Sequence, residues 1–261
     1  MSQPLAYIHP NAKIGSNVVI DPFVTIQDDV VIGKNTWIGS NVTIMEGARI
    51  GDHCKIFPGA VISAIPQDLK FKGEHSLAII GDHTVIRECV TINRGTNSTG
   101  KTEIGTNCLL MAYTHIAHDC LIGNHCIFSN NSTLAGHITI GNYVVLAGLT
   151  AIQQFCSIGD FAFISGGSLV RKDIPPYVKV AREPLIFTGI NSIGMKRNGL
   201  EEKQILHIEE IYKVLFKSKL NISQALKIIE TEIEPTEIRN SILQFIKKSK
   251  HGIVRGYDQK S

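Results

Sequence analysis

The sequence has few aromatic side chains, few charges and no long apolar run. Aromatic residues make up 7% of its 261 positions, and charged residues make up 19%. No apolar stretch approaches the roughly 20 residues that span a bilayer. The first residues, MSQPLAYIHP, lack the charged and apolar segments of a secretory signal. The sequence therefore predicts a protein with no transmembrane segment, located in the cytoplasm.

Metal-binding and nucleic-acid-binding patterns are also missing. No Cys-X-X-Cys pair occurs among the six cysteines, which argues against zinc and disulfide frameworks. No dense stripe of Lys and Arg with interleaved aromatics appears, so nucleic acid is not an expected partner. Residues 171–261 nevertheless hold 17 Lys and Arg against 11 Asp and Glu. This basic segment suits an acidic partner, although a solvated helical face explains the same charges.

What the sequence does have is a repeat of six residues. A large apolar residue stands at every sixth position from Ile8 to Ile62, from Ile80 to Ile92 and from Ile104 to Val170. A period of six fits neither an α-helix nor an ordinary amphipathic strand. It does fit short strands joined by turns, three to a coil, stacked as a parallel β-helix. One coil then takes 18 residues.

The dipeptide Ile-Gly marks these coils and shows where they are interrupted. It recurs at intervals of 18 from Ile14 to Ile50 and again from Ile104 to Ile158, and we expect its glycine to permit a positive φ. The interval from Ile50 to Ile80 is 12 residues too long, and the next is 6 too long. Two loops are therefore predicted, near 66–76 and 93–101. Loops on a rigid scaffold often carry function, although tolerated surface insertions are an alternative.

The cysteines follow the same repeat. Five of the six lie four residues after a hexad Ile, Leu or Phe position, where other hexads carry small or β-branched residues. This placement predicts cysteines that pack in the interior as small apolar side chains. Cys120 lies at this position and no Gly-X-Ser-X-Gly motif occurs, so a cysteine or serine nucleophile is disfavoured.

The C-terminal part of the sequence changes to a helical pattern. We expect Pro175-Pro176 to end the repeat. The stretch that begins near Leu200 carries apolar residues at helical spacing, with acids early and lysines late. Two shorter helices are predicted around 223–230 and 236–248. The sequence thus predicts an all-β fold with an α-helical tail: a parallel β-helix domain at 1–187 and a helical C-terminal domain at 188–261.

The 18-residue coil also places distant polar residues together. Residues 18 apart lie above one another at about 4.8 Å, the spacing of neighbouring strands. The first predicted column is His118, Gly136 and Gln154, and the second is Asp119, His137 and Phe155. A histidine beside a carboxylate is a candidate general base, and a glycine can offer its N–H to an oxyanion. Metal ligation by His115, His118 and His137, or plain exposure of turn histidines, are the alternatives.

Several motifs, taken with the repeat, resemble one enzyme family. They are HIAHDC (115–120), LAGH (134–137), QQFC (153–156), PPYV (175–178) and NSIGMKR (191–197). Together they resemble the UDP-N-acetylglucosamine O-acyltransferases over essentially the whole chain. The resemblance implies a left-handed β-helix, a homotrimer and active sites between neighbouring subunits. The left hand comes only from the family, because parallel crossovers are normally right-handed.

The resemblance also implies a reaction and a set of residues. A 3-hydroxyacyl chain moves from acyl carrier protein to the 3-hydroxyl of UDP-N-acetylglucosamine, the first step of lipid A synthesis, with no metal or cofactor. His118 matches the base, Asp119 the residue that orients it, and the Gly136 amide the oxyanion donor. Further matches are His115, His137, Gln154, Asp68 and Lys70 as substrate contacts, with Asn191 and Arg197 near the nucleotide. The basic tail would face the acidic acyl carrier protein.

The sequence departs from the family at four positions. Gln153 stands where the family often has His, and Ile193 and Asn198 replace charged residues near the nucleotide. Gly166 stands at the position that the family uses to measure chain length, and a glycine there leaves room for a long acyl chain. The sequence fixes neither the preferred chain length nor whether the acceptor carries a 3-hydroxyl or a 3-amine.

Other functions are weaker readings of the same sequence. The related N-acyltransferases carry an N-terminal domain before their repeats, whereas the hexads begin here at Ile8. Small hexapeptide-repeat acetyltransferases usually lack a long helical tail. A non-enzymatic β-helix scaffold would not require His118, Asp119 and Gly136 to lie together across coils.

Overall fold

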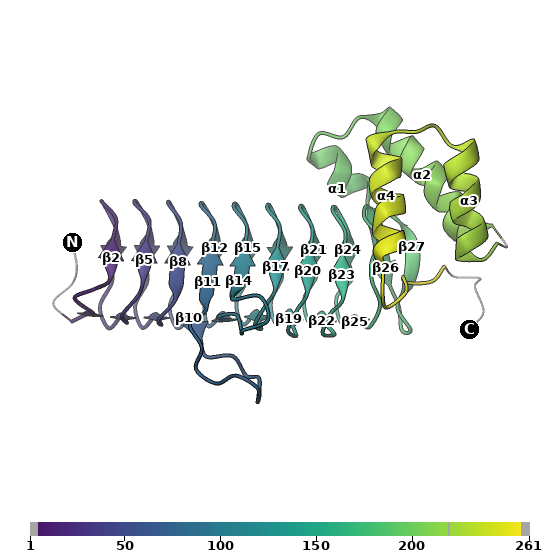
Figure 1. Ribbon diagram of the computed structural model, residues 1–261. Helices are drawn as coiled ribbons and strands as arrows, with labels where there is room; N and C mark the ends of the chain where they lie inside the picture. The colour runs from purple at the N-terminus through teal and green to yellow at the C-terminus, as the bar shows by residue number, and fades with distance from the viewer. Residues whose placement is uncertain (1–4, 219, 257–261) are drawn as a thin grey trace.

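The computed structural model describes residues 5–218 and 220–256. The chain forms a row of stacked coils followed by a group of helices beyond one end (Figure 1). Successive coils pair in parallel at the predicted interval of 18, as where His115 pairs with Thr133 and Leu121 with Thr139. The predicted parallel β-helix with a helical tail is confirmed, and its left hand stays a prediction of the resemblance.

Three sheets form the walls of this β-helix in the described residues. The first holds β1 (Tyr7–Ile8), β4 (Thr25–Ile26), β7 (Thr43–Ile44), β10 (Val61–Ala64), β13 (Thr91–Asn93), β16 (His115–Ile116), β19 (Thr133–Leu134), β22 (Ala151–Ile152) and β25 (Leu169–Val170). The second holds β2 (Lys13–Ile14), β5 (Val31–Ile32), β8 (Ala48–Ile50), β11 (Leu77–Ile80), β14 (Lys101–Ile104), β17 (Leu121–Ile122), β20 (Thr139–Ile140) and β23 (Ser157–Ile158). The third holds β3 (Val19–Ile20), β6 (Trp37–Ile38), β9 (Lys55–Ile56), β12 (Val85–Ile86), β15 (Leu109–Leu110), β18 (Ile127–Phe128), β21 (Val145–Leu146), β24 (Phe163–Ile164), β26 (Val178–Ala181) and β27 (Ile186–Ile190).

The core is built from the hexad residues. Ile26, Ile38 and Ile62 are fully buried, and so are residues four positions later such as Val42. Burying one such large side chain stabilises the fold by about 1.5–3 kcal/mol. The cysteines at this phase are buried as predicted, and burial raises the pKa of the Cys120 thiol to about 12. A thiol held neutral in this way is a packing residue, not a nucleophile.

The corners of the coils correct one expectation about glycine. The residues with positive φ are not the glycines of the Ile-Gly pairs but the residues two positions later, such as Asn35 (φ 57°) and His53 (φ 57°). The glycines are required for a different reason. A Cβ on Gly33 would lie 2.5 Å from the carbonyl carbon of Gly51 in the next coil, so no side chain fits between the coils.

Two segments leave the prism where the intervals predict them. The first loop lies between β10 and β11 and the second between β13 and β14. Both interrupt the corner that joins the first sheet to the second. His118 lies at this same corner one coil further on, between β16 and β17. The first loop projects from the prism in Figure 1.

The repeat does not end at Pro175-Pro176, as we expected from the sequence. Strand β26 continues the third sheet, with Ile164 paired to Val180 at an interval of 16. Two residues are missing from the preceding corner, which also gives Ile158 and Ile174 an interval of 16. This shorter coil breaks the hexad phase without breaking the fold. The antiparallel strand β27 then pairs with β26 and spans position 187, where we expected the domain boundary.

The helices follow the predicted tail and add one element. They are α1 (Ser192–Arg197), α2 (Glu202–Lys217), α3 (Ile222–Glu232) and α4 (Glu237–Lys248). The last three match the predicted helices, and Thr236 caps α4 by accepting from the Arg239 N–H. The short α1 was not predicted. Tyr212 in α2 donates to the Pro176 carbonyl (2.6 Å), which fastens the helices to the last coil. Among the described residues, no helix is long and apolar enough to cross a membrane.

Candidate active site

A histidine–aspartate pair lies at the corner between β16 and β17. His118 Nδ1 donates to Asp119 Oδ2 at 2.8 Å, because an ionised carboxylate can only accept. The Asp119 side chain is fully buried and the His118 side chain is 9% exposed. Asp119 has a positive φ of 59°, which turns the chain at this corner. The pairing fixes the imidazole ring and leaves Nε2 as the free nitrogen.

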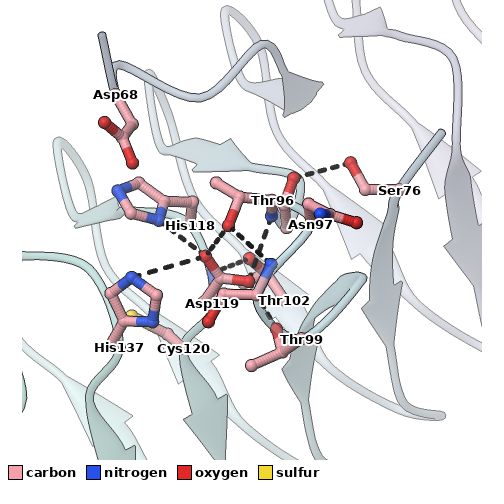
Figure 2. Close-up of polar contacts among 12 residues, drawn as sticks. Asp68, Ser76, Thr96, Asn97, Thr99, Thr102, His118, Asp119, Cys120 and His137 are labelled. Atoms are coloured by element: carbon pink, nitrogen blue, oxygen red, sulfur yellow. Dashed lines mark hydrogen bonds and ion pairs between the residues drawn. The ribbon is translucent and has the colours of Figure 1, made fainter. Parts of the chain in front are cut away.

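Asp119 is ionised although it is buried. Desolvation alone would raise its pKa, but hydrogen bonds from Thr99, Thr96 and His118 outweigh that effect and lower the pKa to about 2. Thr96 contributes its N–H (3.0 Å) and its hydroxyl (2.7 Å). Both threonines belong to the second loop, and Figure 2 shows them gathered around the carboxylate. The pair is therefore a neutral base supported by a fixed negative charge.

The predicted columns are present at this corner. The His137 N–H donates to the His118 carbonyl (3.0 Å), and the Phe155 N–H donates to the Gly136 carbonyl (3.3 Å). The His137 and Phe155 rings are stacked with centroids 4.8 Å apart. His137 Nε2 also lies 3.7 Å from Asp119 Oδ2. Two imidazoles thus flank one carboxylate, as the interval of 18 predicts.

Gly136 lies directly against the His118 ring. A Cβ at this position would come within 2.6 Å of His118 Cε1 and 2.8 Å of Nε2. Any side chain here would displace the imidazole, so the close approach requires glycine. The Gly136 N–H donates to no group in the part of the chain that the structure describes. A free backbone donor beside a free imidazole nitrogen is the arrangement that an oxyanion intermediate needs.

The first loop closes a groove over this pair. The groove has a volume of about 1160 Å³ and brings Asp68 and Lys70 of the loop together with His118, His137 and Gln154. Asp68 is turned toward His118 in Figure 2. Asp68 is half-buried and Lys70 is exposed, and Asp68 Oδ1 accepts from the Lys70 N–H (2.9 Å). Both loops therefore contribute to one site, and the second loop is the part that the sequence analysis did not assign.

Four of the predicted site residues lie away from this groove. His115 is on β16, where the Thr91 hydroxyl meets its Nδ1 (2.7 Å) and burial lowers its pKa. Gly166 is at the corner between the third and first sheets, while Asn191 caps α1 and donates to the Phe161 carbonyl at the remaining corner (2.9 Å). Arg197 ends α1. Within one chain, these residues do not meet His118.

The same cluster has the composition of a metal site. One ligand atom from each of His118, Asp119 and His137 lies within 4.8 Å of the others. However, the Asp119 oxygens already accept from His118 and from two threonines of the second loop. A metal ion would have to displace these donors from a fully buried carboxylate. The predicted ligand set with His115 is not formed, because His115 contacts Thr91 instead.

Family models match most of the chain. The model described as UDP-N-acetylglucosamine O-acyltransferase, domain 2, matches residues 173–254. The bacterial transferase hexapeptide model matches residues 101–136, and the model of the GMPPB C-terminal domain matches residues 2–102.

Whole-chain relatives decide the family. The acyl-[acyl-carrier-protein]–UDP-N-acetylglucosamine O-acyltransferase of Chlorobaculum parvum is 56% identical over 253 residues, which cover 95% of both chains. The enzyme of the same description from a Sulfurihydrogenibium species is 53% identical and covers 96% of this chain and 93% of its own. The chain belongs to the UDP-N-acetylglucosamine O-acyltransferase family.

Solved members of the UDP-N-acetylglucosamine O-acyltransferase family have the same fold. The UDP-N-acetylglucosamine acyltransferase of Bacteroides fragilis superposes with a TM-score of 0.96 at 50% identity, covering 98% of this chain and 100% of the other. The enzyme of Francisella novicida superposes with a TM-score of 0.95 at 39% identity, covering 99% and 95%. Both loops and the helical tail therefore lie within the part that this family shares.

Proposed function

We propose that this chain is an acyltransferase that moves a 3-hydroxyacyl group from acyl carrier protein to the 3-hydroxyl of UDP-N-acetylglucosamine. The names of its relatives support the substrates, and the family resemblance supports the first step of lipid A synthesis in the cytoplasm. One observation carries the chemistry. His118 turns Nδ1 to a buried carboxylate, and its Nε2 lies beside the position of the Gly136 amide.

The reaction follows from these groups. His118 Nε2 takes the proton of the sugar hydroxyl while its oxygen attacks the thioester carbonyl, and a general base of this kind contributes about 10²–10⁴ in rate. The Gly136 N–H stabilises the oxyanion, a contribution of about 10²–10³. When the intermediate collapses, the C–S bond breaks and His118 returns the proton to the departing sulfur. Asp119 stabilises the imidazolium that exists between these two transfers.

The first loop and the second column suit the acceptor sugar. Asp68 offers a carboxylate to sugar hydroxyls, and Lys70 adds a positive charge above the groove. His137 and Gln154 provide further polar groups on the opposite wall. Asn191 and Arg197 are proposed nucleotide contacts, and His115 is proposed as a substrate contact through the resemblance.

We propose a homotrimer because the site residues are divided among the three corners of one chain. Neighbouring subunits would bring Gly166, Asn191 and Arg197 of one chain against His118 of another. Mixing an Arg197→Ala chain with a His118→Ala chain should restore activity above that of either parent, since some clefts then combine two intact halves. A monomer by light scattering, or mixtures no more active than their parents, would contradict the trimer.

The decisive experiment is acyl transfer by the wild type and His118→Ala. The wild type should acylate UDP-N-acetylglucosamine, and its 3-amino analogue is assayed in parallel, with a series of 3-hydroxyacyl carrier proteins. His118→Ala should fold normally and lose at least about 10²-fold in kcat, because the base is gone.

His125→Ala is the matched control for this substitution. His125 lies at the next corner along the chain, stacked on Tyr143 and outside the groove. Its activity should stay near that of the wild type. A His118→Ala enzyme that keeps most of its kcat would remove the assigned base, and a wild type without acyl transfer would remove the proposed function.

A further inference from the structure

The second loop lies over the catalytic pair although no sequence motif drew attention to it. It leaves β13 after Asn93, rejoins the β-helix at Lys101, and carries Thr96 and Thr99. Both hydroxyls reach Asp119, the residue that holds His118 (Figure 2). Neither threonine is needed to close the β-helix, because the loop is an insertion between two strands.

The contacts on Asp119 are complete and of one kind. Oδ1 accepts from the Thr96 N–H (3.0 Å) and the Thr99 hydroxyl, and Oδ2 accepts from the Thr96 hydroxyl (2.7 Å) and from His118. The Asp119 N–H donates to the Thr102 hydroxyl (2.8 Å). Each group that touches the carboxylate is therefore a donor. A buried carboxylate surrounded by donors stays ionised and keeps one orientation.

The loop is itself rigid. The Gly100 N–H donates to the Thr96 carbonyl (2.8 Å) and the Ser98 N–H to the Thr96 hydroxyl (3.2 Å). Gly95 is pressed against the far end of the loop, since a Cβ there would lie 2.2 Å from the Lys101 nitrogen. The Ser76 hydroxyl of the first loop donates to the Gly95 carbonyl (2.6 Å). The two hydroxyls are thus presented to Asp119 by a closed, braced turn.

We infer that Thr96 and Thr99 are positioning residues of the acyl transfer, which act on His118 through Asp119. They hold the carboxylate in the ionised state and in the plane that Nδ1 of His118 requires. Without them, the carboxylate can rotate or take up a proton, and the imidazole loses the partner that fixes its tautomer. This inference rests on the proposed role of His118 as general base.

The test uses pairs of substitutions that differ only in the hydroxyl. Thr96→Val and Thr99→Val keep the shape and remove the donor, whereas Thr96→Ser and Thr99→Ser keep the donor. Each valine variant should lower kcat about 10-fold, the loss typical of one hydrogen bond to a charged group, with both KM values within about twofold. The serine variants should stay within about threefold of the wild type.

A pH profile separates positioning from a general loss of structure. The titratable groups that face the carboxylate are His118 and His137, at 2.8 and 3.7 Å, and the other contacts described are neutral. Without the donating hydroxyls, Asp119 should protonate at higher pH. The acid-side fall of kcat should then move to higher pH in the valine variants and stay in place in the serine variants.

The outcomes are distinct from those that test the proposed function. Wild-type transfer and an inactive His118→Ala establish the base independently of the loop. Valine variants with unchanged kcat and pH profile would then overturn the inference alone. So would serine variants as impaired as the valine ones, or a rise in KM without a fall in kcat. If a valine variant does not fold, the serine variant and Thr99→Ala provide the same comparison.

Discussion

Gly166 shows how one missing side chain sets a specificity. It is exposed at the corner between the third and first sheets, and a Cβ there would meet the Gly148 carbonyl oxygen at 3.0 Å, with its next neighbours at 3.8 Å or more. A small shift of that carbonyl would admit a side chain. Glycine at this corner leaves open the space that we assign to the end of the acyl chain.

Gly166→Met should therefore shorten the preferred acyl chain. The added side chain occupies the distal part of the space and excludes the terminal carbons, each of which contributes about 0.8 kcal/mol when buried. A series of 3-hydroxyacyl carrier proteins gives kcat/KM against chain length, and the optimum should move to shorter chains. An unchanged optimum in a folded variant would refute Gly166 as the residue that measures the chain.

Asp119 also makes stability depend on pH. Its pKa of about 2 lies below the unfolded value near 3.9, so its contribution is present above pH 4 and is lost as pH falls toward 2. A shift of this size corresponds to roughly 2–3 kcal/mol for each chain. The difference in Tm between the wild type and Asp119→Asn should be largest near pH 6 and shrink below pH 4. A difference that stays constant down to pH 3 would contradict this origin.

The two loops form one element through a single carboxylate. Glu74 in the first loop accepts from the Lys72 N–H (2.8 Å) and from the Asn97 N–H of the second loop (2.9 Å). These backbone donors, Lys72 first, lower the pKa of Glu74. Asn97 is next to Thr96, so the bridge links the loop that carries Asp68 to the loop that holds Asp119.

Glu74→Gln should loosen this bridge. The amide keeps one accepting oxygen and cannot serve both N–H groups, so the first loop should spend less time over the groove. We expect the KM for the UDP-sugar to rise about 3–10-fold with a smaller change in kcat. Glu88→Gln is the control, because Glu88 pairs only with the neighbouring Arg87 in the described contacts. Equal effects of the two substitutions would argue against the bridge.

The interval of residues explains which elements the sequence could predict. Where coils hold 18 residues, every coil obeys the same packing constraint, and the His118–Gly136 and Asp119–His137 columns follow directly. The last coil lacks two residues at one corner, so β26 was invisible to a search for sixes. Thr96 and Thr99 were missed for a related reason, since a loop outside the repeat has no register. The corner was still available as a signal, because both insertions fall where His118 lies.

At the scale of the whole molecule, the helical tail brings positive charge to the edge of the active site. Lys248, Lys250 and His251 line a groove of about 450 Å³ that also borders His137 and Phe155. The segment that carries them is fixed to the last coil. The Ser249 hydroxyl donates to Asp173 (2.6 Å), and the Asp173 N–H donates to the Gly252 carbonyl (3.0 Å). This places the groove beside the route to His118.

Acyl carrier protein is acidic, so this basic groove should steer the donor and not the acceptor. Lys250→Gln should raise the KM for acyl carrier protein about 2–5-fold and leave the KM for the UDP-sugar unchanged, because complementary charge acts mainly on association. In the wild type, kcat/KM for the donor should fall as salt rises, and the variant should show a smaller fall. Lys247→Gln is the control, since Lys247 pairs with Glu230 and does not line this groove. A salt-independent rate, or a change confined to the UDP-sugar, would assign the groove to something other than the carrier protein.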